Sequence, residues 1–238
     1  MENTKSAFMD RYLTPLAVLL AAVIIALAMI YGQGLGSGNK GADGKAAVAV
    51  DIKDVKTDNS PYIGDKNAPT TVAVFYDYQC PFCKQFEEAV TPKLIDAYVK
   101  EGKTKIVFKD FQFLGEDSTT AALFGRALWE AHPDKFHDWF VAMAGAQDDE
   151  GDQGFGDLAS IQKLSAGIPG IDVAKVTKLM TDKKADYMKA IEADRAEGAA
   201  LGINGTPSVI AGTKLFSGMS PDAFFTGISA QLDAQLKK

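Results

Sequence analysis

The 238-residue chain contains only two cysteines and two histidines, which limits the sites that it can form. A scaffold held together by disulfides needs several cysteine pairs, so that class of protein is excluded. A zinc site needs about four ligands, and His132 and His137 follow Cys83 by roughly fifty residues, without the spacing of a zinc motif. The chain has 25 basic and 31 acidic residues, a net charge of −6, which argues against a nucleic acid as partner. We also find no internal repeat, phosphate-binding loop or serine-hydrolase motif.

Charge is missing from residues 12–31, and Leu16–Ile30 is an unbroken apolar run. Twenty helical residues span about 30 Å, the thickness of the hydrocarbon core, so we predict a transmembrane anchor there. Residues 1–11 are then a short cytoplasmic tail, because Arg11 precedes the span closely. Two alternatives stay open: a buried soluble helix, and a signal peptide cleaved after Ala28, whose surroundings have the small-x-small form.

The stretch that follows this span is rich in glycine, with six glycines in residues 32–44. Such a composition is typical of a flexible tether. We interpret residues 32–60 as a linker, within which the mostly apolar Ala46–Ile52 is a candidate first strand. Residues 61–238 are long enough to form one domain with a sizeable core.

Both cysteines lie in a Cys-x-x-Cys motif, at Cys80 and Cys83. The run Thr71–Tyr76 is β-branched and aromatic, as in a buried strand. After the motif, apolar residues recur at helical spacing: Phe82, Phe86, Val90, Leu94 and Tyr98. The motif therefore starts a helix, with Pro81 in the first turn, where a missing N–H costs nothing. A helix N-terminus stabilises an anion, and a thiolate is the anion that a redox cysteine needs.

A Cys-x-x-Cys pair can also be half of a zinc site or a static structural disulfide. The first lacks further ligands, and the second closes a loop too short to constrain the unfolded chain much. The sequence therefore favours a redox-active pair, in which Cys80, nearer the exposed helix end, is the nucleophile and the buried Cys83 resolves the mixed disulfide. Two interpretations of Asp77 stay open. Its carboxylate either tunes the cysteine site or relays the proton there, or it is only a solvated or core-edge carboxylate.

The rest of the chain alternates between strand and helix patterns. Lys105–Phe108 is predicted to be a strand, and a helical block of roughly ninety residues, about 113–202, follows it. Its four helices have apolar stripes at Ala121, Phe124, Leu128 and Ala131, at Phe136, Trp139, Phe140 and Met143, at Val173, Val176 and Met180, and at Ala185, Met188 and Ile191. We expect Asp117 or Ser118 to cap the first helix. Short strands at Ser208–Ile210 and Lys214–Phe216 precede a last helix that Ser220 and Pro221 begin and that runs to Leu236.

Two further features of the helical block are interpreted as structural. The acidic stretch at 147–154 lacks the glycine and glutamate of a calcium-binding EF-hand loop, so we interpret it as a solvated loop. His132 and His137 lie near the start of the second helix of the block. We expect both to have a structural role.

Three stretches resemble DsbA-like thiol–disulfide oxidoreductases, a family with the thioredoxin fold. Phe75–Cys83 resembles that family's active site, and Gly202–Val209 its cis-proline loop. Lys109–Phe111 and Leu114–Ser118 resemble the loop that leads into its helical insertion. The resemblance covers roughly residues 60 to 238 and implies a thioredoxin-like α/β fold with an inserted helical block.

The resemblance also implies roles for residues outside the cysteine pair. It implies that Pro207 is cis and faces the cysteines, leaving the Thr206 backbone free to pair with a substrate strand. Pro81 and Phe82 are expected to complete the active-site loop. Phe82 replaces the histidine of the most oxidising members, so the Cys80 pKa should be lowered less than in those members. No cofactor and no metal are expected besides the Cys80–Cys83 disulfide.

We therefore predict an enzyme that oxidises dithiols of exported proteins outside the cytoplasm. Its expected partners are reduced or misoxidised exported proteins, a membrane redox partner that reoxidises it, and the membrane itself. Two alternatives remain, a tethered disulfide reductase and a binding or chaperone module with an inert disulfide. If the N-terminal span is cleaved, the enzyme would be soluble in the periplasm instead of membrane-anchored.

Overall fold

The computed structural model describes residues 50–147 and 155–237. These residues belong to a compact unit that covers Ala47–Lys238. The predicted membrane span, the glycine-rich tether and residues 148–154 of the acidic stretch lie outside the described residues. Within the described ranges, no helix is long and apolar enough to cross a membrane.

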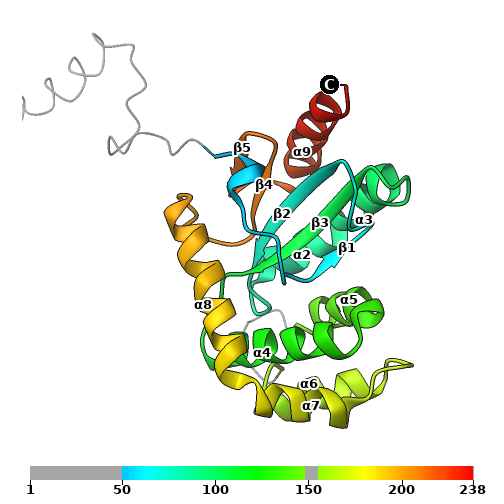
Figure 1. Cartoon of the computed structure of the whole chain (residues 1–238), viewed down its shortest axis with the longest axis vertical. Coiled ribbons are helices and arrows are strands. Elements are labelled where there is room, and N and C mark those ends of the chain that lie inside the picture. Colours follow the sequence, from blue (N-terminus) through cyan, green and yellow to red (C-terminus); the bar gives the residue numbers. More distant parts are fainter. Residues whose placement is uncertain (1–49, 148–154, 238) are drawn as a thin grey trace, which may run out of the picture. The chain divides into compact units, whose positions relative to one another are not determined.

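A mixed five-stranded sheet, in the order β1-β3-β2-β4-β5, forms the centre of the described unit (Figure 1). β2 and β3 are parallel and pair along their whole length, so Tyr76 and Asp110 lie side by side at their carboxyl ends. The other three pairings are antiparallel. The strands are β1 (Tyr62–Ile63), β2 (Thr70–Tyr76), β3 (Thr104–Asp110), β4 (Ser208–Ala211) and β5 (Lys214–Ser217).

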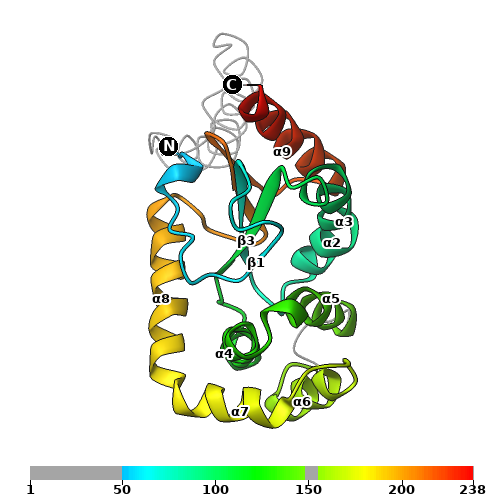
Figure 2. The same cartoon turned by 45° about the vertical axis from the view of Figure 1, so that its right-hand side comes forward.

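Among the described residues, helices follow β2, β3 and β5, and five of them form a block inserted between β3 and β4 (Figures 1 and 2). The inserted helices are α4 (Glu116–Ala131), α5 (Phe136–Ala146), α6 (Leu158–Ala166), α7 (Val173–Asp182) and α8 (Lys184–Ala200). The others are α2 (Pro81–Ala89), α3 (Thr91–Leu94) and α9 (Pro221–Leu236), with a π-helical turn at Ile95–Val99 and 3₁₀ turns at Ile52–Asp54 and Pro133–Lys135. The predicted α/β fold with a helical insertion is confirmed.

The sheet separates two hydrophobic cores, because side chains alternate between its faces along each strand. Val72, Val74 and Tyr76 of β2 join the larger core, which includes residues of α2, α4, α5 and α9. Ala73 and Phe75 join the smaller core, with residues such as Phe111 and Ile210. The active-site helix α2 is thus packed between the sheet and the helical insertion.

Some predicted boundaries are wrong. A first strand at Ala46–Ile52 was expected, but its described part, Val50–Ile52, forms no strand, and Ile52 begins a 3₁₀ turn. The first strand is Tyr62–Ile63 instead. The helix after the cysteines was expected to continue to Tyr98, but it breaks at Val90, because Pro92 lacks the N–H that would continue the bonding pattern.

The start of α4 also differs from the prediction. Neither Asp117 nor Ser118 is its cap: the helix begins after Gly115, whose φ of 101° suits glycine. Ser118 instead donates its hydroxyl hydrogen to the buried Asp77 carboxylate. The predicted stripe is confirmed at Ala121, Phe124 and Leu128, which are buried.

The structure contains one inserted helix, α6, that the sequence analysis missed. Asp157 caps it by accepting a hydrogen bond from the Ser160 backbone N–H at 2.7 Å. Ile161 is buried, and Leu158 and Leu164 pack against the same core. This cap and the spacing of the three apolar residues were the signals that could have revealed the helix.

Candidate active site

The cysteine pair lies where β2 passes into α2. Cys80 is the N-cap residue of α2 and Pro81 is the first helical residue, so both fit their expected positions. The Cys80 carbonyl accepts hydrogen bonds from the N–H groups of Cys83, at 3.0 Å, and of Lys84, at 3.1 Å. Both cysteines are free thiols in this structure.

The two thiols have opposite acidities. The pKa of Cys80 is lowered to about 6, mainly by a hydrogen bond from the Cys83 thiol, while burial opposes this effect. Thr206 and the N–H groups of Cys83 and Phe82 contribute to the lowering. Burial raises the pKa of Cys83, and the neighbouring Cys80 raises it further. Near neutral pH, Cys80 is therefore mainly a thiolate and Cys83 mainly a thiol.

Access to the two sulfurs differs less than the sequence analysis expected. Cys80 was placed at the exposed end of the helix, but this residue is only 4% exposed, and Cys83 is 0% exposed. The exposed members of the motif are Pro81 and Phe82, of which Phe82 is 65% exposed. The prediction that Phe82 belongs to the apolar stripe of α2 is therefore wrong, because the first turn of the helix points this ring towards solvent.

The cis-proline loop lies against Cys80, as expected. The Thr206–Pro207 peptide bond is cis, which confirms that expectation. The Cys80 sulfur lies 3.3 Å from the Thr206 carbonyl oxygen and donates to it in the thiol form. Pro207 is buried, whereas Thr206 is half-buried. The structure thus brings Thr206 and Pro207 together with Cys80 and Cys83, although Cys80 and Thr206 are 126 positions apart in the sequence.

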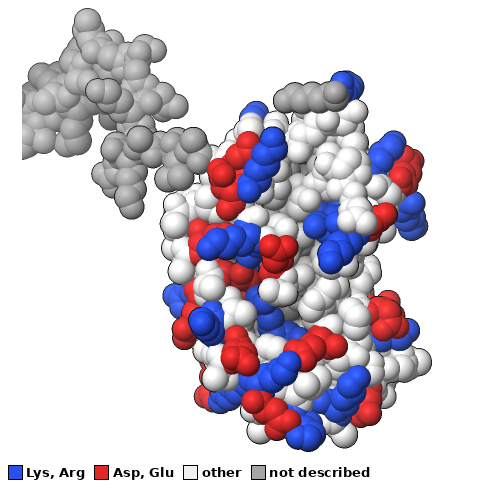
Figure 3. Space-filling model, viewed as in Figure 1, with Lys and Arg blue, Asp and Glu red and all other residues white. Residues whose placement is uncertain are grey.

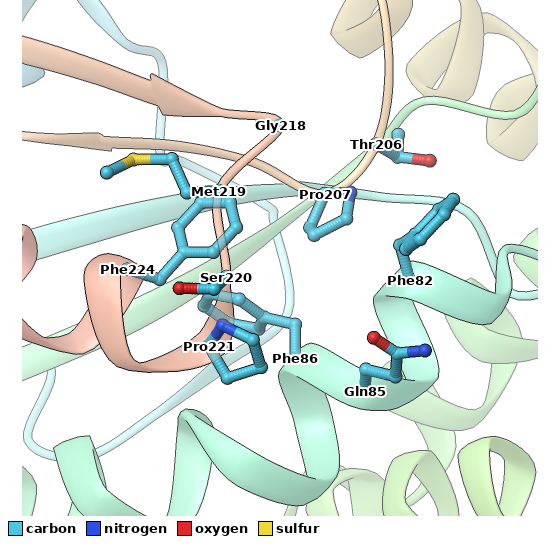
Figure 4. Close-up of a pocket in the computed structure, with 10 residues that line it drawn as sticks. All are labelled: Phe82, Gln85, Phe86, Thr206, Pro207, Gly218, Met219, Ser220, Pro221 and Phe224. Carbon is cyan, nitrogen blue, oxygen red and sulfur yellow. The ribbon is translucent and has the colours of Figure 1, made fainter.

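An uncharged pocket of about 480 Å³ opens beside the cysteine motif (Figure 4). Figure 4 shows the Phe82 ring at one end of the pocket and the Phe224 ring at the other, with Pro207 between them. Residues from α2, the cis-proline loop and the β5–α9 connection line it: Phe82, Gln85, Phe86, Thr206, Pro207, Gly218, Met219, Ser220, Pro221 and Phe224. The connection residues were missed by the sequence analysis, because nothing local marks them as neighbours of the cysteines.

Asp77 is neither solvated nor at the core edge: it is completely buried below the motif. Its carboxylate accepts hydrogen bonds from the backbone N–H groups of Gln79 and Phe113, both at 2.9 Å, and of Leu114, at 3.2 Å. Asp77 therefore joins the loop before Cys80 to the loop that leads into α4. These bonds give the carboxylate a positioning role, since buried carboxylates need such donors.

The remaining candidates have structural contacts. His132 Nε2 accepts a hydrogen bond from the Asp172 N–H at 3.2 Å, which joins the end of α4 to the start of α7. His137 lies beside the buried Glu87, a residue that the sequence analysis did not single out. Within the described ranges, no group of three or more His, Cys, Asp or Glu side chains is arranged to hold a metal ion.

Charge is mixed on the molecular surface that Figure 3 shows. Lys and Arg side chains lie among Asp and Glu side chains there, without a large basic area. The large area of one sign that nucleic-acid-binding surfaces have is therefore not seen on this face.

Comparison with known proteins links this geometry to a family. The family described as Thioredoxin matches residues 56–230. The probable disulfide bond formation protein D of Bacillus anthracis is 28% identical over 176 residues, which are 74% of this chain and 78% of that protein. The crystal structure of oxidised BdbD from Bacillus subtilis is similar with a TM-score of 0.70 and 25% identity, over 81% of this chain and 99% of that one. The thiol–disulfide exchange protein alpha-DsbA2 from Wolbachia pipientis shares the fold, with a TM-score of 0.63 and 24% identity, over 75% and 90% of the two chains.

Proposed function

Because this chain belongs to the thioredoxin family, we propose that it oxidises dithiols of exported proteins through Cys80 and Cys83. The chain is a thiol–disulfide oxidoreductase, as its similarity to disulfide bond formation proteins shows. The direction of electron flow, the residues that act and the place of action are our proposal.

The observation that carries the proposal is the unequal acidity of the two thiols. The pKa of Cys80 is lowered to about 6, while the pKa of Cys83 is raised. A stabilised Cys80 thiolate stabilises the reduced form of the enzyme, so its disulfide is easier to reduce and a stronger oxidant. Phe82 supplies no positive charge to this thiolate, so the oxidising power stays below that of the strongest members.

The exchange proceeds in two steps. A substrate thiolate attacks the Cys80 sulfur, the Cys80–Cys83 bond breaks, and Cys83 leaves as a thiolate that takes up a proton. The second substrate thiol then loses its proton and attacks the substrate sulfur of the mixed disulfide. Cys80 leaves as its stabilised thiolate, a good leaving group at neutral pH. The substrate gains a disulfide, and the enzyme is left with two reduced cysteines.

The uncharged pocket suits an extended apolar segment beside the substrate cysteine. Phe82 and Met219 are large apolar side chains that are exposed at this pocket. Burying them under a substrate would remove apolar surface from water, which favours binding. The Thr206 backbone beside Cys80 is in position to pair with the bound segment.

We further propose that the enzyme works outside the cytoplasm and is held at the membrane. This proposal rests on the uncharged residues 12–31, between a cytoplasmic tail at 1–11 and a linker at 32–60, with the catalytic domain at 61–238. A membrane redox partner with its own disulfide would reoxidise Cys80 and Cys83. N-terminal sequencing of membrane-extracted protein is the test. A mature chain that starts at Met29 would replace the anchor with a cleaved signal peptide.

The activity is tested with reduced, unfolded ribonuclease and stoichiometric oxidised protein. The wild type should form disulfides in the ribonuclease and become reduced itself, whereas Cys80→Ser should do neither. Cys83→Ser carries no protein disulfide and should also leave reduced ribonuclease unchanged, but its Cys80 thiolate should attack a disulfide of oxidised ribonuclease and stay trapped in a mixed disulfide, visible by mass spectrometry. Failure of the wild type to oxidise ribonuclease, together with reduction of oxidised ribonuclease by the reduced protein in the reverse assay, would assign a reductase. No exchange in either direction would assign an inert disulfide.

A further inference from the structure

Gln147 directly follows the last residue of α5 and is buried, with only 5% of its surface exposed. Its side-chain Nε2 donates a hydrogen bond to the carbonyl oxygen of Tyr78, two residues before Cys80. Its own carbonyl oxygen accepts a hydrogen bond, at 2.9 Å, from Nζ of Lys84, the residue after Cys83. One residue at the end of an inserted helix therefore contacts both flanks of the cysteine motif.

The chemistry of the side-chain contact fixes the orientation of this amide. A carbonyl oxygen only accepts hydrogen bonds, so the amide nitrogen of Gln147 must face Tyr78. The amide oxygen Oε1 is then buried without a hydrogen-bond partner. A buried polar atom without a partner costs stability, so packing alone does not explain a glutamine at this position.

The same helix also holds the side chain of Tyr78. The Tyr78 ring lies against the rings of Trp139 and Phe140 of α5, at centroid distances of 5.5 and 5.7 Å. Both of these α5 residues are completely buried, so they present a closely packed surface to that ring. Tyr78 is the second residue of a turn that the Cys80 N–H closes by donating to the Asp77 carbonyl at 3.2 Å. The position of α5 is therefore transmitted to the turn that ends at the motif.

The first turn of α2 needs support from outside the helix. Pro81 is exposed and Phe82 is 65% exposed, so the turn buries little side-chain surface of its own. The Cys83 thiol is the main cause of the low pKa of Cys80, and the N–H groups of Cys83 and Phe82 contribute to it. These donors stabilise a thiolate only while they point at its sulfur, because hydrogen bonds weaken steeply with misalignment.

We propose that Gln147 is a positioning residue, which holds the cysteine motif from both flanks and keeps the first turn of α2 aligned with the Cys80 sulfur. The proposal rests on the proposed role of Cys80 as the nucleophile. Gln147 acts through Tyr78 and Lys84, so its loss should change the acidity of Cys80 and leave the steps of the exchange intact. The helical insertion thereby takes part in setting the oxidising power of the disulfide.

The test measures the pKa of Cys80 from the pH dependence of its alkylation by iodoacetamide, in the reduced full chain in detergent. Mass spectrometry checks that Cys80 carries the label. Gln147→Met removes the amide at a similar length and should raise the pKa of Cys80 from about 6 to roughly 7, a shift that the loss of one hydrogen bond allows. The equilibrium constant for oxidation of glutathione by the protein should fall by about fivefold at pH 7, because less thiolate then stabilises the reduced form.

Gln162→Met is the matched control. Nε2 of Gln162 donates to the Thr177 hydroxyl at 2.9 Å, between α6 and α7, at the end of the helical block farther from α2 (Figures 1 and 2). The control therefore also loses one side-chain hydrogen bond, but the pKa of Cys80 should stay near 6 even if stability falls. Gln147→Ala makes room for water, which solvates the Tyr78 carbonyl without holding it in place. This variant should also raise the pKa of Cys80, and it carries the test if Gln147→Met does not fold.

The possible results separate the proposals. A Cys80 pKa that stays near 6 in the folded Gln147 variants would overturn the positioning role. An equal rise in Gln162→Met would also overturn it, since a general loosening of the helical block would then explain the effect. A wild type in which the Cys80 pKa lies near the ordinary 9.0 would instead refute the stabilised thiolate, and with it the proposed function.

Discussion

Two buried polar regions of this protein differ in how completely their polar groups are paired. Beside β3, Lys109, Asp110, Arg126, Asp194 and Glu197 form what we call the ion cluster, in which each charge faces an opposite one. Beside Cys83, Tyr76, Glu87 and His137 form what we call the thiol cluster, in which Glu87 Oε1 faces His137 Nε2 at 3.5 Å. The Tyr76 hydroxyl, Glu87 Oε2 and His137 Nε2 have no hydrogen-bond partner there, whereas only Glu197 Oε2 lacks one in the ion cluster. Paired buried charges hold elements together, whereas a buried polar group without a hydrogen bond costs stability.

The ion cluster joins the helical insertion to the sheet. Arg126 of α4 pairs with Asp110 of β3, at 2.5 Å, and with Asp194 of α8. Lys109 of β3 pairs with Asp194 and, at 3.0 Å, with Glu197, both on α8. The end of α8 leads into the cis-proline loop, so these pairs help to hold that loop in position against Cys80.

The largest expected effect is on the ion cluster. Arg126→Met would leave Asp110 without its buried charge partner and Asp194 with Lys109 alone, which should lower the free energy of unfolding by about 3–5 kcal/mol. Urea unfolding measures the loss, and Arg195→Met, at an exposed position of α8, is the matched control with little expected change. The Cys80 pKa of the folded variant should stay near 6. A stability near that of the wild type would contradict the role of the cluster.

The next effect concerns Cys80, whose pKa falls from the ordinary 9.0 to about 6 on folding. The unfolded reduced chain then binds more protons than the folded one between these values, so the stability of the reduced protein should rise from pH 6 to 9. The gain should be on the order of 2 kcal/mol, after a discount for solvent screening at this helix end. It should be lost again as the pH falls through 6.

This pH dependence is measured by urea unfolding of the reduced protein at several pH values. Cys80→Ser, unfolded under the same reducing conditions, is the control and should lack the rise. Above pH 9 the raised pKa of Cys83 acts in the opposite direction, so the comparison ends there. Parallel curves for the wild type and Cys80→Ser would contradict a stabilised thiolate.

The smallest expected effect is on the stability of a variant of the thiol cluster. Glu87→Met replaces a buried carboxylate that has an unpartnered oxygen with an apolar side chain of similar length, so it should raise stability by about 1 kcal/mol. The same change at Glu88, which is exposed, should alter stability by less than about 0.5 kcal/mol. Thermal unfolding of the oxidised proteins measures both. A loss of stability in Glu87→Met would mean that Glu87 is structural, like the charges of the ion cluster.

The two clusters also show how far the sequence could predict this site. The Cys-x-x-Cys motif, the strand before it and the helix after it are local in sequence, so Cys80 and Cys83 could be placed at a helix N-terminus. Thr206 and Pro207 were placed beside them only through a family resemblance. Asp77 was recognised as a candidate, but its burial depends on the loop around Phe113 and could not be derived from spacing.

Tertiary packing decides the features that the sequence did not reveal. Glu87 looks like any helical glutamate in sequence, and only the packing of α5 against α2 buries it beside His137. The ion cluster combines residues of β3, α4 and α8, and no local pattern connects them. The exposure of Phe82 likewise follows from the rotation of the first helical turn, which apolar periodicity does not define.

The central claim is that the Cys80 thiolate is stabilised enough to make the Cys80–Cys83 disulfide an oxidant. The most direct measurement is equilibration of residues 47–238, the compact unit, with glutathione buffers of known ratio, with the full chain in detergent as control. We expect a reduction potential between the thioredoxin value of about −270 mV and the strong-oxidant value of about −120 mV. A potential at or below about −270 mV would contradict the claim and assign the protein to the reductases.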